Sequence, residues 1–160
     1  MKHLWIAAAF LFLISCGQVQ DKTNDLNKEK VIQEVKEMFD DYHHDIKAGG
    51  LTAEFKYLDP SDDFFWVPPG YRVALSYDSV RTILETNAPQ FSKIEFYWES
   101  LEIFPLSYEI ATYTGVVGGT MTDTTGVDSN VRIIESGTVI KRTDGWKLLC
   151  GQSAALTQEP

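Results

Sequence analysis

Basic side chains are scarce in this 160-residue sequence, where 14 Lys and Arg residues stand against 23 Asp and Glu residues for a formal net charge of −9. Nucleic-acid phosphates need compensating cations, so this balance argues against nucleic acid as a partner. Cysteine is sparse too, with only Cys16 and Cys150. The sequence has no Gly-rich phosphate loop, no Ser/His/Asp arrangement and no Cys/His zinc spacing, so we expect neither a metal nor an organic cofactor.

Apolar residues, in contrast, are plentiful. Hydrophobic residues make up 44% of the chain and charged residues 23%, which is the composition of a folded globular protein. A chain of this length fits a single domain and buries about two thirds of its unfolded surface. We therefore expect a real hydrophobic core that needs no metal and no disulfide.

The one long apolar run lies at the N-terminus. It covers residues 4–14 and follows the basic Lys2. As a helix this run would span about 16 Å, too short to cross a bilayer, so the pattern predicts a secretory signal over residues 1–15. The segment ends in Leu-Ile-Ser-Cys-Gly at residues 13–17, which resembles the lipobox of bacterial lipoprotein signals.

The lipobox resemblance implies that the thiol of Cys16 receives a diacylglycerol and that cleavage leaves this residue first. Several acyl chains, such as palmitate, give stable membrane anchoring. We therefore expect export and a lipid anchor in the bacterial cell envelope, with the membrane as a partner through Cys16. Gly17 replaces the Asp that retains many lipoproteins at the inner membrane, which favours the outer membrane where the host has one. A plain secretory signal with an incidental Cys is the alternative.

Hydropathy patterns divide the rest of the chain. Residues 16–27 are polar and are expected to form a tether, residues 28–156 one domain, and residues 157–160 a tail. Apolar spacing of three and four predicts helices at 28–48, 51–58 and 77–87. Alternation with a period of two predicts strands at 64–67, 94–104, 108–119, 130–142 and 146–154, with a Thr/Gly-rich loop at 120–129 and an Asp-Gly turn at 143–145.

Helices followed by a long antiparallel sheet indicate an α+β fold. A curved antiparallel sheet wrapped around one long helix forms a cone that is open at one end. This organisation resembles the nuclear transport factor 2-like superfamily and, within it, the SnoaL-like proteins, over residues 28–156. The resemblance is carried by the helix end at 46–49, the segment Asp-Phe-Phe-Trp-Val-Pro-Pro-Gly at 63–70, and the strand–turn–strand ending at 137–148.

The resemblance implies a cone that binds a small molecule, and homodimers are common among such proteins. The superfamily holds isomerases, dehydratases, cyclases and many non-enzymes, so the fold does not settle the function. In relatives like ketosteroid isomerase an Asp base would fall near Val67, which cannot take a proton. A second acid would fall near Gly137 or Thr138, and Tyr42 matches a helical Tyr. Only one of the three positions matches, which argues against that isomerase chemistry.

Glu135 is the candidate proton-transfer group, because it shares strand parity with the apolar residues 131, 133 and 139. If this parity faces the cone, the carboxyl group is buried, its pKa is raised, and it can act as a general acid or base. If this parity is the outer face, Arg132 and Arg142 point into the cone instead. Tyr42 is the second catalytic candidate, and Tyr113 is a further hydrogen-bond donor.

Aromatic and polar residues on the predicted strands and first helix are candidates for the pocket wall. His43 lies at the edge of the helix stripe, whereas His44 lies on its solvent side; with Asp40, His44 would at most form a weak surface metal site, and we expect an ordinary solvated helix face there. Gln152 stands where SnoaL-like enzymes often carry a His. The full predicted pocket set is Tyr42, His43, Trp66, Tyr97, Trp98, Tyr113, Arg132, Glu135 and Gln152.

The sequence thus predicts a lipid-anchored, exported SnoaL-like domain that binds a small, partly apolar ligand in its cone or mediates assembly in the cell envelope. The alternative is a hydro-lyase, isomerase or cyclase that uses Glu135. An inward Glu135 with a perturbed pKa beside an open cavity would favour the enzyme, whereas a filled cone with an apolar outer face would favour assembly.

Overall fold

The computed structural model describes residues 27–156. The predicted signal segment 1–15, the lipidation site at Cys16, most of the tether and the tail 157–160 lie outside the described residues. Within the described part of the chain, no helix is both long enough and apolar enough to span a membrane.

Helix α1 spans Lys28–Gly49, as its three-four spacing of apolar residues predicts. Oδ1 of Asn27 accepts a hydrogen bond of 3.0 Å from the backbone N–H of Lys30, which caps the helix start. Gly50, at φ +76°, ends the helix in a conformation that favours glycine. The buried stripe of α1 is Val31, Val35, Met38, Phe39 and Ile46.

Two further helical segments cover the end of the molecule where α1 finishes. The 3₁₀ helix η1 spans Leu51–Lys56 and is shorter than the helix predicted over residues 51–58. Helix α2 spans Tyr77–Asn87, with Ser76 as its N-cap, and the 3₁₀ turn η2 at Ala88–Gln90 leads into the sheet. The 3₁₀ geometry of η1 stacks residues three apart on one face, which later determines where Glu54 points.

One five-stranded sheet follows, in the order β1-β5-β4-β3-β2. Its strands are β1 (Phe65–Val67), β2 (Phe91–Pro105), β3 (Ile110–Asp123), β4 (Asp128–Arg142) and β5 (Gly145–Ala155). Strands β2 to β5 pair antiparallel, as predicted, but β1 runs parallel to residues 150–152 of β5, so the sheet is mixed. The parity of a three-residue strand carries no information on its direction, so the parallel pairing of β1 adds to the predicted antiparallel sheet.

The predicted loop at 120–129 is mostly strand. Strand β3 continues to Asp123, β4 begins at Asp128, and only four residues form the turn between them. Oδ1 of Asp123 accepts hydrogen bonds from the backbone N–H groups of Thr125 and Val127, and Gly126 adopts φ +87°. The loop was predicted from the high content of threonine and glycine in this segment. Threonine also favours extended backbone, so the threonines at the strand ends pair within the sheet.

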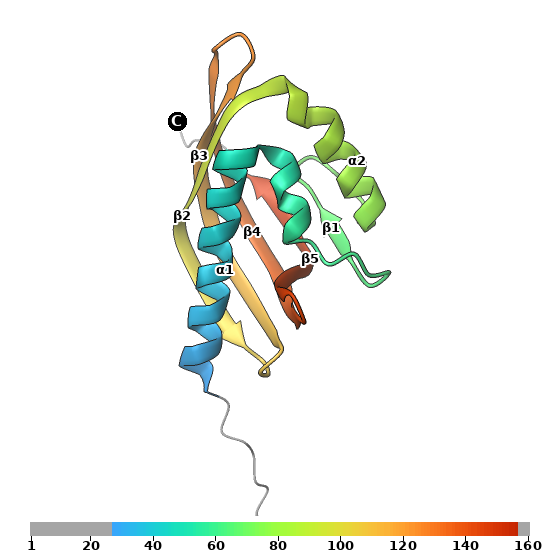
Figure 1. Ribbon diagram of the computed structural model, residues 1–160, viewed down its shortest axis with the longest axis vertical. Coiled ribbons are helices and arrows are strands. Elements are labelled where there is room, and N and C mark those ends of the chain that lie inside the picture. The colour runs from blue at the N-terminus through green and yellow to red at the C-terminus, as the bar shows by residue number, and fades with distance from the viewer. Residues whose placement is uncertain (1–26, 157–160) are drawn as a thin grey trace, which may run out of the picture.

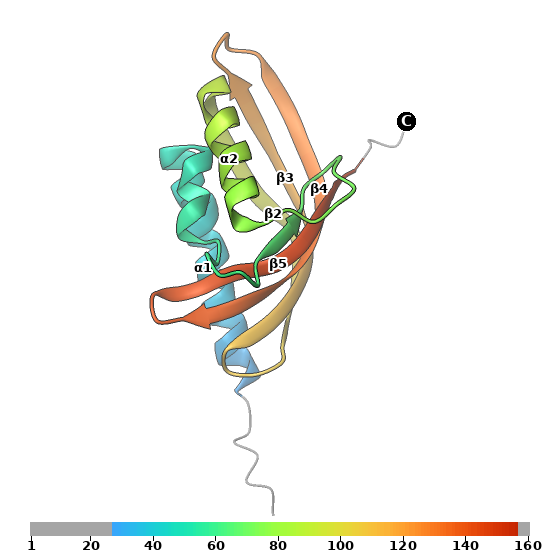
Figure 2. The same ribbon diagram turned by 90° about the vertical axis from the view of Figure 1, so that its right-hand side faces the viewer.

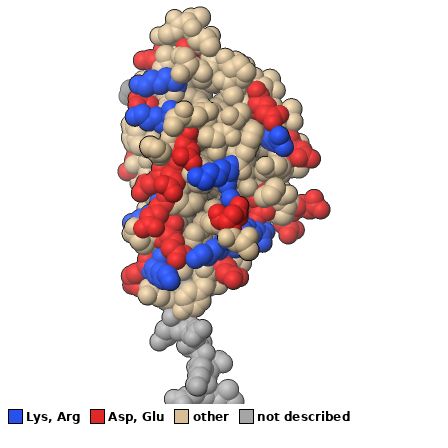
Figure 3. Space-filling model, viewed as in Figure 1, with Lys and Arg blue, Asp and Glu red and all other residues tan. Residues whose placement is uncertain are grey.

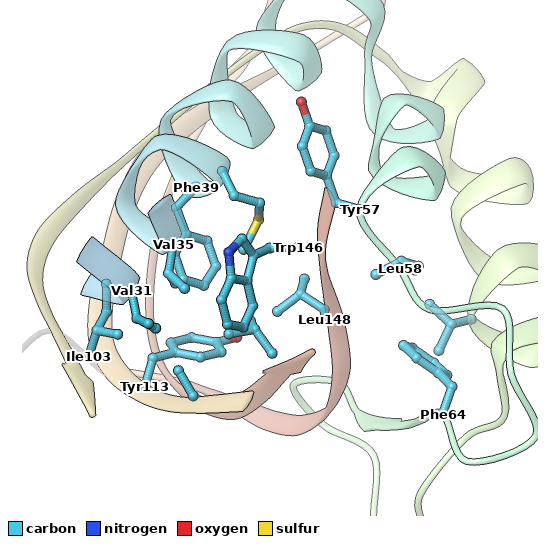
Figure 4. Packing of buried hydrophobic residues seen from close by; sticks show 14 residues of the cluster. Val31, Val35, Phe39, Tyr57, Leu58, Phe64, Ile103, Tyr113, Trp146 and Leu148 are labelled. Carbon is cyan, nitrogen blue, oxygen red and sulfur yellow. The ribbon is translucent and has the colours of Figure 1, made fainter. Parts of the chain in front are cut away.

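The sheet curves around α1, which lies across its concave face (Figures 1 and 2). Helix α2 and η1 lie over the end of the sheet that carries the β3–β4 turn, and α1 begins at the opposite end (Figure 1). Between α1 and the sheet the core packs Val35 and Phe39 against Tyr113, Trp146 and Leu148 (Figure 4). This core fills the narrow end of the cone and leaves the other end to the site described below.

The exposed face of α1 carries acidic side chains in a row along the helix (Figure 3).

Cys150 lies on the outer face of the sheet, in register with Phe65, and is only partly buried. The side chain at this position of β5 alternates away from the core.

Candidate functional site

An apolar cavity of about 220 Å³ lies between α1, η1, α2 and the concave face of the sheet. Most of its wall is aliphatic and aromatic, and four side chains bring ionisable groups to it: Tyr42, His43, Glu54 and Glu135. The remaining lining residues are Leu51, Trp66, Pro68, Pro69, Val80, Ile83, Leu84, Phe96, Val117, Met121, Ile133 and Ser153.

Strand parity places Glu135 in this cavity. The register pairs Glu135 with Gly115 of β3 and Ser153 of β5, and Ile133 two residues earlier also lines the cavity. Both positions are on the concave face, since residues two apart on a strand share a face. The open question left by the sequence is thus resolved: the apolar parity of β4 faces the cone, and Glu135 with it.

Tyr113 is hydrogen-bonded to this carboxyl group. Its hydroxyl donates to Oε1 of Glu135 at 2.6 Å, and Tyr113 itself is only 2% exposed. Burial raises the pKa of Glu135 to about 7, although the hydrogen bond from Tyr113 works in the opposite direction by favouring the charged carboxylate. Burial beside the carboxyl group also raises the pKa of Tyr113, which therefore stays a donor.

A second tyrosine–carboxyl pair faces the same cavity from the helical layer. Burial raises the pKa of Glu54 to about 7, a hydrogen bond with Tyr42 partly opposes this rise, and the charge of Glu135 adds to it. The pKa of Tyr42 is raised well above its ordinary range, first by burial and then by the two carboxyl groups. Both carboxyl groups are therefore poised to gain or lose a proton near neutral pH.

His43 completes the ionisable part of the wall, and burial lowers its pKa to about 4. Its ring lies against aromatic neighbours, with ring centroids 5.6 Å from Trp98 and 5.4 Å from Tyr42. The imidazole is consequently neutral at physiological pH, where it can donate one hydrogen bond and accept another.

Trp66 forms one side of the cavity and is seated on glycines. Its indole Nε1 donates to the hydroxyl of Ser153 at 3.2 Å. A Cβ atom at Gly151 would lie 2.5 Å from the Trp66 ring, and a Cβ atom at Gly137 would lie 3.3 Å from it. These two glycines therefore allow the ring to lie close to the backbone of β4 and β5.

Three of the predicted pocket residues do not lie on the concave face of the sheet. Arg132 and Tyr97 are exposed on the convex face of the sheet, where the guanidinium group of Arg132 binds the carboxylate of Glu99 at 2.9 Å. Gln152 lines a separate hollow with Tyr71. The prediction was wrong for these three because residues 97, 132 and 152 have the opposite strand parity to Glu135.

Trp98 and Tyr113 lie on the concave face but behind the cavity wall. Trp98 packs edge-on against Phe39 with ring centroids 5.1 Å apart, and Tyr113 packs 4.7 Å from the same ring. They support the site from the core, because the Trp98 ring lies against His43 and the hydroxyl of Tyr113 donates to Glu135. Of the predicted set, Tyr42, His43, Trp66 and Glu135 line the cavity itself.

Sequence reasoning missed Glu54. The helix predicted over residues 51–58 contributed no residue to the predicted pocket, although Glu54 lies in it. The signal was present, because Glu54 is three residues after the buried Leu51, and residues three apart lie on one face of a 3₁₀ helix.

A wider hollow of about 590 Å³ lies near the β4–β5 turn, but each of its charged groups already has a partner of opposite charge, that of Lys56 being Asp45 outside the hollow. Nε of Arg142 binds Oδ2 of the buried Asp59 at 2.6 Å, and Nζ of Lys147 binds Asp144 at 2.9 Å. Arg142 thus points to this edge and not into the cone. Within residues 27–156 no group of three His, Cys, Asp or Glu side chains gathers closely enough to hold a metal ion.

No protein-family model and no curated protein sequence matches this chain. Solved structures do match. A nuclear transport factor 2-like superfamily protein from Salmonella enterica is 16% identical, with a TM-score of 0.69 over 83% of this chain and 96% of that one.

Two further matches are enzymes by name. A candidate scytalone dehydratase from Novosphingobium aromaticivorans is 15% identical, with a TM-score of 0.69 over 81% of this chain and 87% of that one. A hexachlorocyclohexane dehydrochlorinase is 10% identical, with a TM-score of 0.64 over 81% of this chain and 88% of that one. The chain therefore has the nuclear transport factor 2-like fold, as the sequence predicted, and at these identities the likeness shows the fold alone.

Proposed function

We propose that this chain, with its nuclear transport factor 2-like fold, binds a small and largely apolar molecule in the cavity and exchanges protons with it through Glu135 and Glu54. One observation carries the proposal: two carboxyl groups line the same apolar cavity, that of Glu135 hydrogen-bonded to Tyr113 and that of Glu54 beside Tyr42. Buried carboxyl groups with pKa values near neutrality are costly to keep in a fold, and they are common where proton transfer is the task.

The two carboxyl groups suit an elimination or an isomerisation. Glu135, as the carboxylate, takes a proton from a carbon atom of the bound molecule, and the electron pair left behind forms a carbon–carbon double bond and expels the oxygen of a hydroxyl group on the neighbouring carbon. Glu54, as the neutral acid, gives its proton to that oxygen, which leaves as water. If the proton returns to a different carbon instead, the product is an isomer. The proposed class is therefore a hydro-lyase or isomerase.

The similar structures support this class without identifying a substrate. A dehydrochlorinase and a candidate dehydratase are both named for elimination reactions. In this chain the position near Val67 cannot supply a base, and Glu135 enters the cone from β4 instead. The proposal therefore rests on this chain's own carboxyl groups and not on a base carried over from a relative.

A neutral probe with a single acidic C–H bond tests the proposal. In 5-nitrobenzisoxazole a carboxylate removes the proton on carbon, the carbon–nitrogen triple bond forms, the N–O bond breaks, and a coloured phenolate is released. We expect residues 17–160 to accelerate this reaction and the rate to rise as pH passes through about 7, where Glu135 ionises. E135Q should lose at least about tenfold of the rate.

The matched control is E102Q, which removes a carboxyl group from the exposed face of β2 and should leave the rate unchanged. A rate equal in wild type and E135Q would overturn the assignment of Glu135. A wild-type rate no faster than that of the same concentration of free acetate would overturn the proposed proton transfer altogether.

We also propose that the domain is exported and anchored to the bacterial envelope by a lipid on Cys16. The lipobox-like residues 13–17 support this proposal. Helix α1 begins at the end of the molecule opposite α2 (Figure 1), so a tether that precedes it would leave the cavity end turned away from the anchor.

Assembly is a second candidate function, and the convex face of the sheet supports it. Phe65, Phe104 and Ile134 are each more than 40% exposed on strands of this face. Patches of exposed apolar side chains often mark contact surfaces. If this face joins copies of the chain, the wild type should sediment as an oligomer, and F104D should sediment with a lower molecular mass. A wild type that sediments as a monomer would remove this candidate.

A further inference from the structure

The cavity has one sign of charge. Among the described residues that line it, the groups able to ionise are Tyr42 and His43 from α1, Glu54 from η1 and Glu135 from β4, and no Lys or Arg side chain is among them. Helix α2 contributes only the apolar Val80, Ile83 and Leu84, and β1 and β5 contribute Trp66 and Ser153. Behind the wall, β3 adds the hydroxyl of Tyr113.

None of these groups can become a cation under ordinary conditions. His43 is buried against aromatic rings and is neutral near pH 7, since its pKa is about 4. The two arginines that could have supplied a positive charge point elsewhere: Arg132 binds Glu99 on the convex face, and Arg142 binds Asp59 at the edge of the sheet. A bound carboxylate or phosphate would thus lie beside two carboxyl groups with no compensating cation, which is unfavourable in an apolar site.

Aromatic rings supply a further preference. Tyr42, Trp66 and Phe96 line the same cavity as the two carboxyl groups. The faces of aromatic rings attract cations, and buried carboxylates bind an ammonium group through short, charge-assisted hydrogen bonds. An apolar wall, aromatic rings and two carboxyl groups together match a molecule with an apolar body and one positive charge.

We propose that the ligand of this cavity is a small apolar molecule that carries one protonated amine, held between Glu54 and Glu135, and that anionic amphiphiles are excluded. This inference rests on the proposed function, because it assumes that the cavity is the ligand site, and it adds the charge of the ligand. The ammonium group offsets the negative charge of the carboxyl pair, so it favours the form in which Glu135 is ionised and able to accept a proton while Glu54 keeps the proton that it donates.

Three probes of nearly equal size and different charge test the proposal: phenethylamine, phenethyl alcohol and phenylacetate. We expect calorimetric titration of residues 17–160 at about pH 8 to give binding of the amine at least about tenfold tighter than the alcohol, with phenylacetate weakest. Amine binding should weaken by about tenfold between about pH 8 and about pH 6, because the carboxyl groups then hold protons that the ammonium group must displace.

E54Q and E135Q should each reduce the preference for the amine over the alcohol, and E102Q on the outer face should not. An amine that binds no tighter than the alcohol, or a phenylacetate that binds as tightly as the amine, would overturn the charge assignment. If the alcohol binds and the amine has no advantage, the proposed function survives without this inference. If none of the three probes binds, both are wrong.

Discussion

The hydroxyl of Tyr113 on β3 donates a 2.6 Å hydrogen bond to Oε1 of Glu135 on β4, from behind the cavity wall. This bond favours the carboxylate, whereas burial favours the neutral acid and prevails, so the pKa of Glu135 lies at about 7. The core residue Tyr113 therefore adjusts the acidity of a group that reaches the cavity.

Tyr113→Phe removes that bond and should raise the pKa of Glu135 above its wild-type value. The pH at which cleavage of 5-nitrobenzisoxazole reaches half of its maximum should move upward, and the free energy of unfolding should fall by about 1 kcal/mol. Tyr71→Phe, on an exposed loop, serves as the control and should change neither quantity. An unchanged or lower midpoint in Tyr113→Phe would show that the bond does not act on Glu135.

Glu135→Gln should change how stability depends on pH. In the folded protein the pKa of Glu135 is about 7, and the ordinary value for Glu is 4.5, so the folded state holds the proton more tightly than the unfolded state. The wild type should therefore lose stability as pH rises from about 4.5 to about 7, by on the order of 2–3 kcal/mol for this one group. Loss of the charge at residue 135 should also lower the pKa of Glu54, whose rise it reinforces.

Urea unfolding at about pH 5 and about pH 8 measures this effect. The difference in unfolding free energy between the two pH values should be smaller in Glu135→Gln than in wild type, and Glu102→Gln should keep the wild-type difference. His43 has the opposite sign, because its lowered pKa of about 4 costs stability as pH falls below about 6.5, so the comparison is made between variants and not read from wild type alone. Equal differences in Glu135→Gln and wild type would contradict the raised pKa.

Gly151→Ala should displace Trp66 from the cavity wall. The added Cβ atom would lie 2.5 Å from the indole ring and 2.6 Å from the backbone oxygen of Ser136, and that oxygen cannot move aside cheaply. We expect a loss of about 1–3 kcal/mol in unfolding free energy. The fluorescence of Trp66, isolated by comparison with a Trp66→Phe variant, should shift toward the solvent-exposed spectrum.

The matched control is Gly49→Ala at the end of α1. A Cβ atom there meets only Ala53, at an ordinary 3.5 Å, so this change should be neutral or slightly stabilising. Equal stability in the two variants would show that the packing of Trp66 does not require glycine at residue 151.

The sequence predicted most of the fold because its signals are local. The apolar spacing of α1, the cap at Asn27 and the alternation of the long strands each depend on neighbouring residues. The direction of β1 depends on where its three residues meet β5, which no local pattern records. The turn at residues 124–127 was overestimated because threonine is frequent both in loops and in strands.

The site was predictable only in part. The alternation of residues divides β4 into two faces. Which face meets the helices depends on how the whole molecule packs, so the sequence could not exclude Arg132 from the pocket. Glu54 was missed because its neighbour Tyr42 belongs to a different helix, and only the folded chain brings the two side chains together. Tyr42, His43, Trp66 and Glu135 were found because each lies on an apolar stripe or parity where an ionisable or aromatic group stands out.

Cys16→Ser tests the membrane anchor. If the thiol of Cys16 carries the lipid, this variant should leave the membrane fraction and accumulate as a soluble or unprocessed chain, because a single segment of residues 4–14 is too short to hold it. Cys150→Ser is the control and should fractionate like wild type. Unchanged membrane fractionation of Cys16→Ser would contradict the anchor, and the account of the cavity would stand independently.

The acidity of Glu54 and Glu135 is the centre of this account, and a carbon-13 NMR titration of the glutamate carboxyl groups in residues 17–160 tests it most directly. Signals absent from E54Q and E135Q assign the two residues. The account predicts that both carboxyl groups titrate near pH 7, well apart from the exposed glutamates, with E135Q lowering the pKa of Glu54. Titration of both groups at the ordinary value of about 4.5 would contradict it, because a Glu54 side chain that is ionised at every working pH could not donate the proton that the proposed reaction needs.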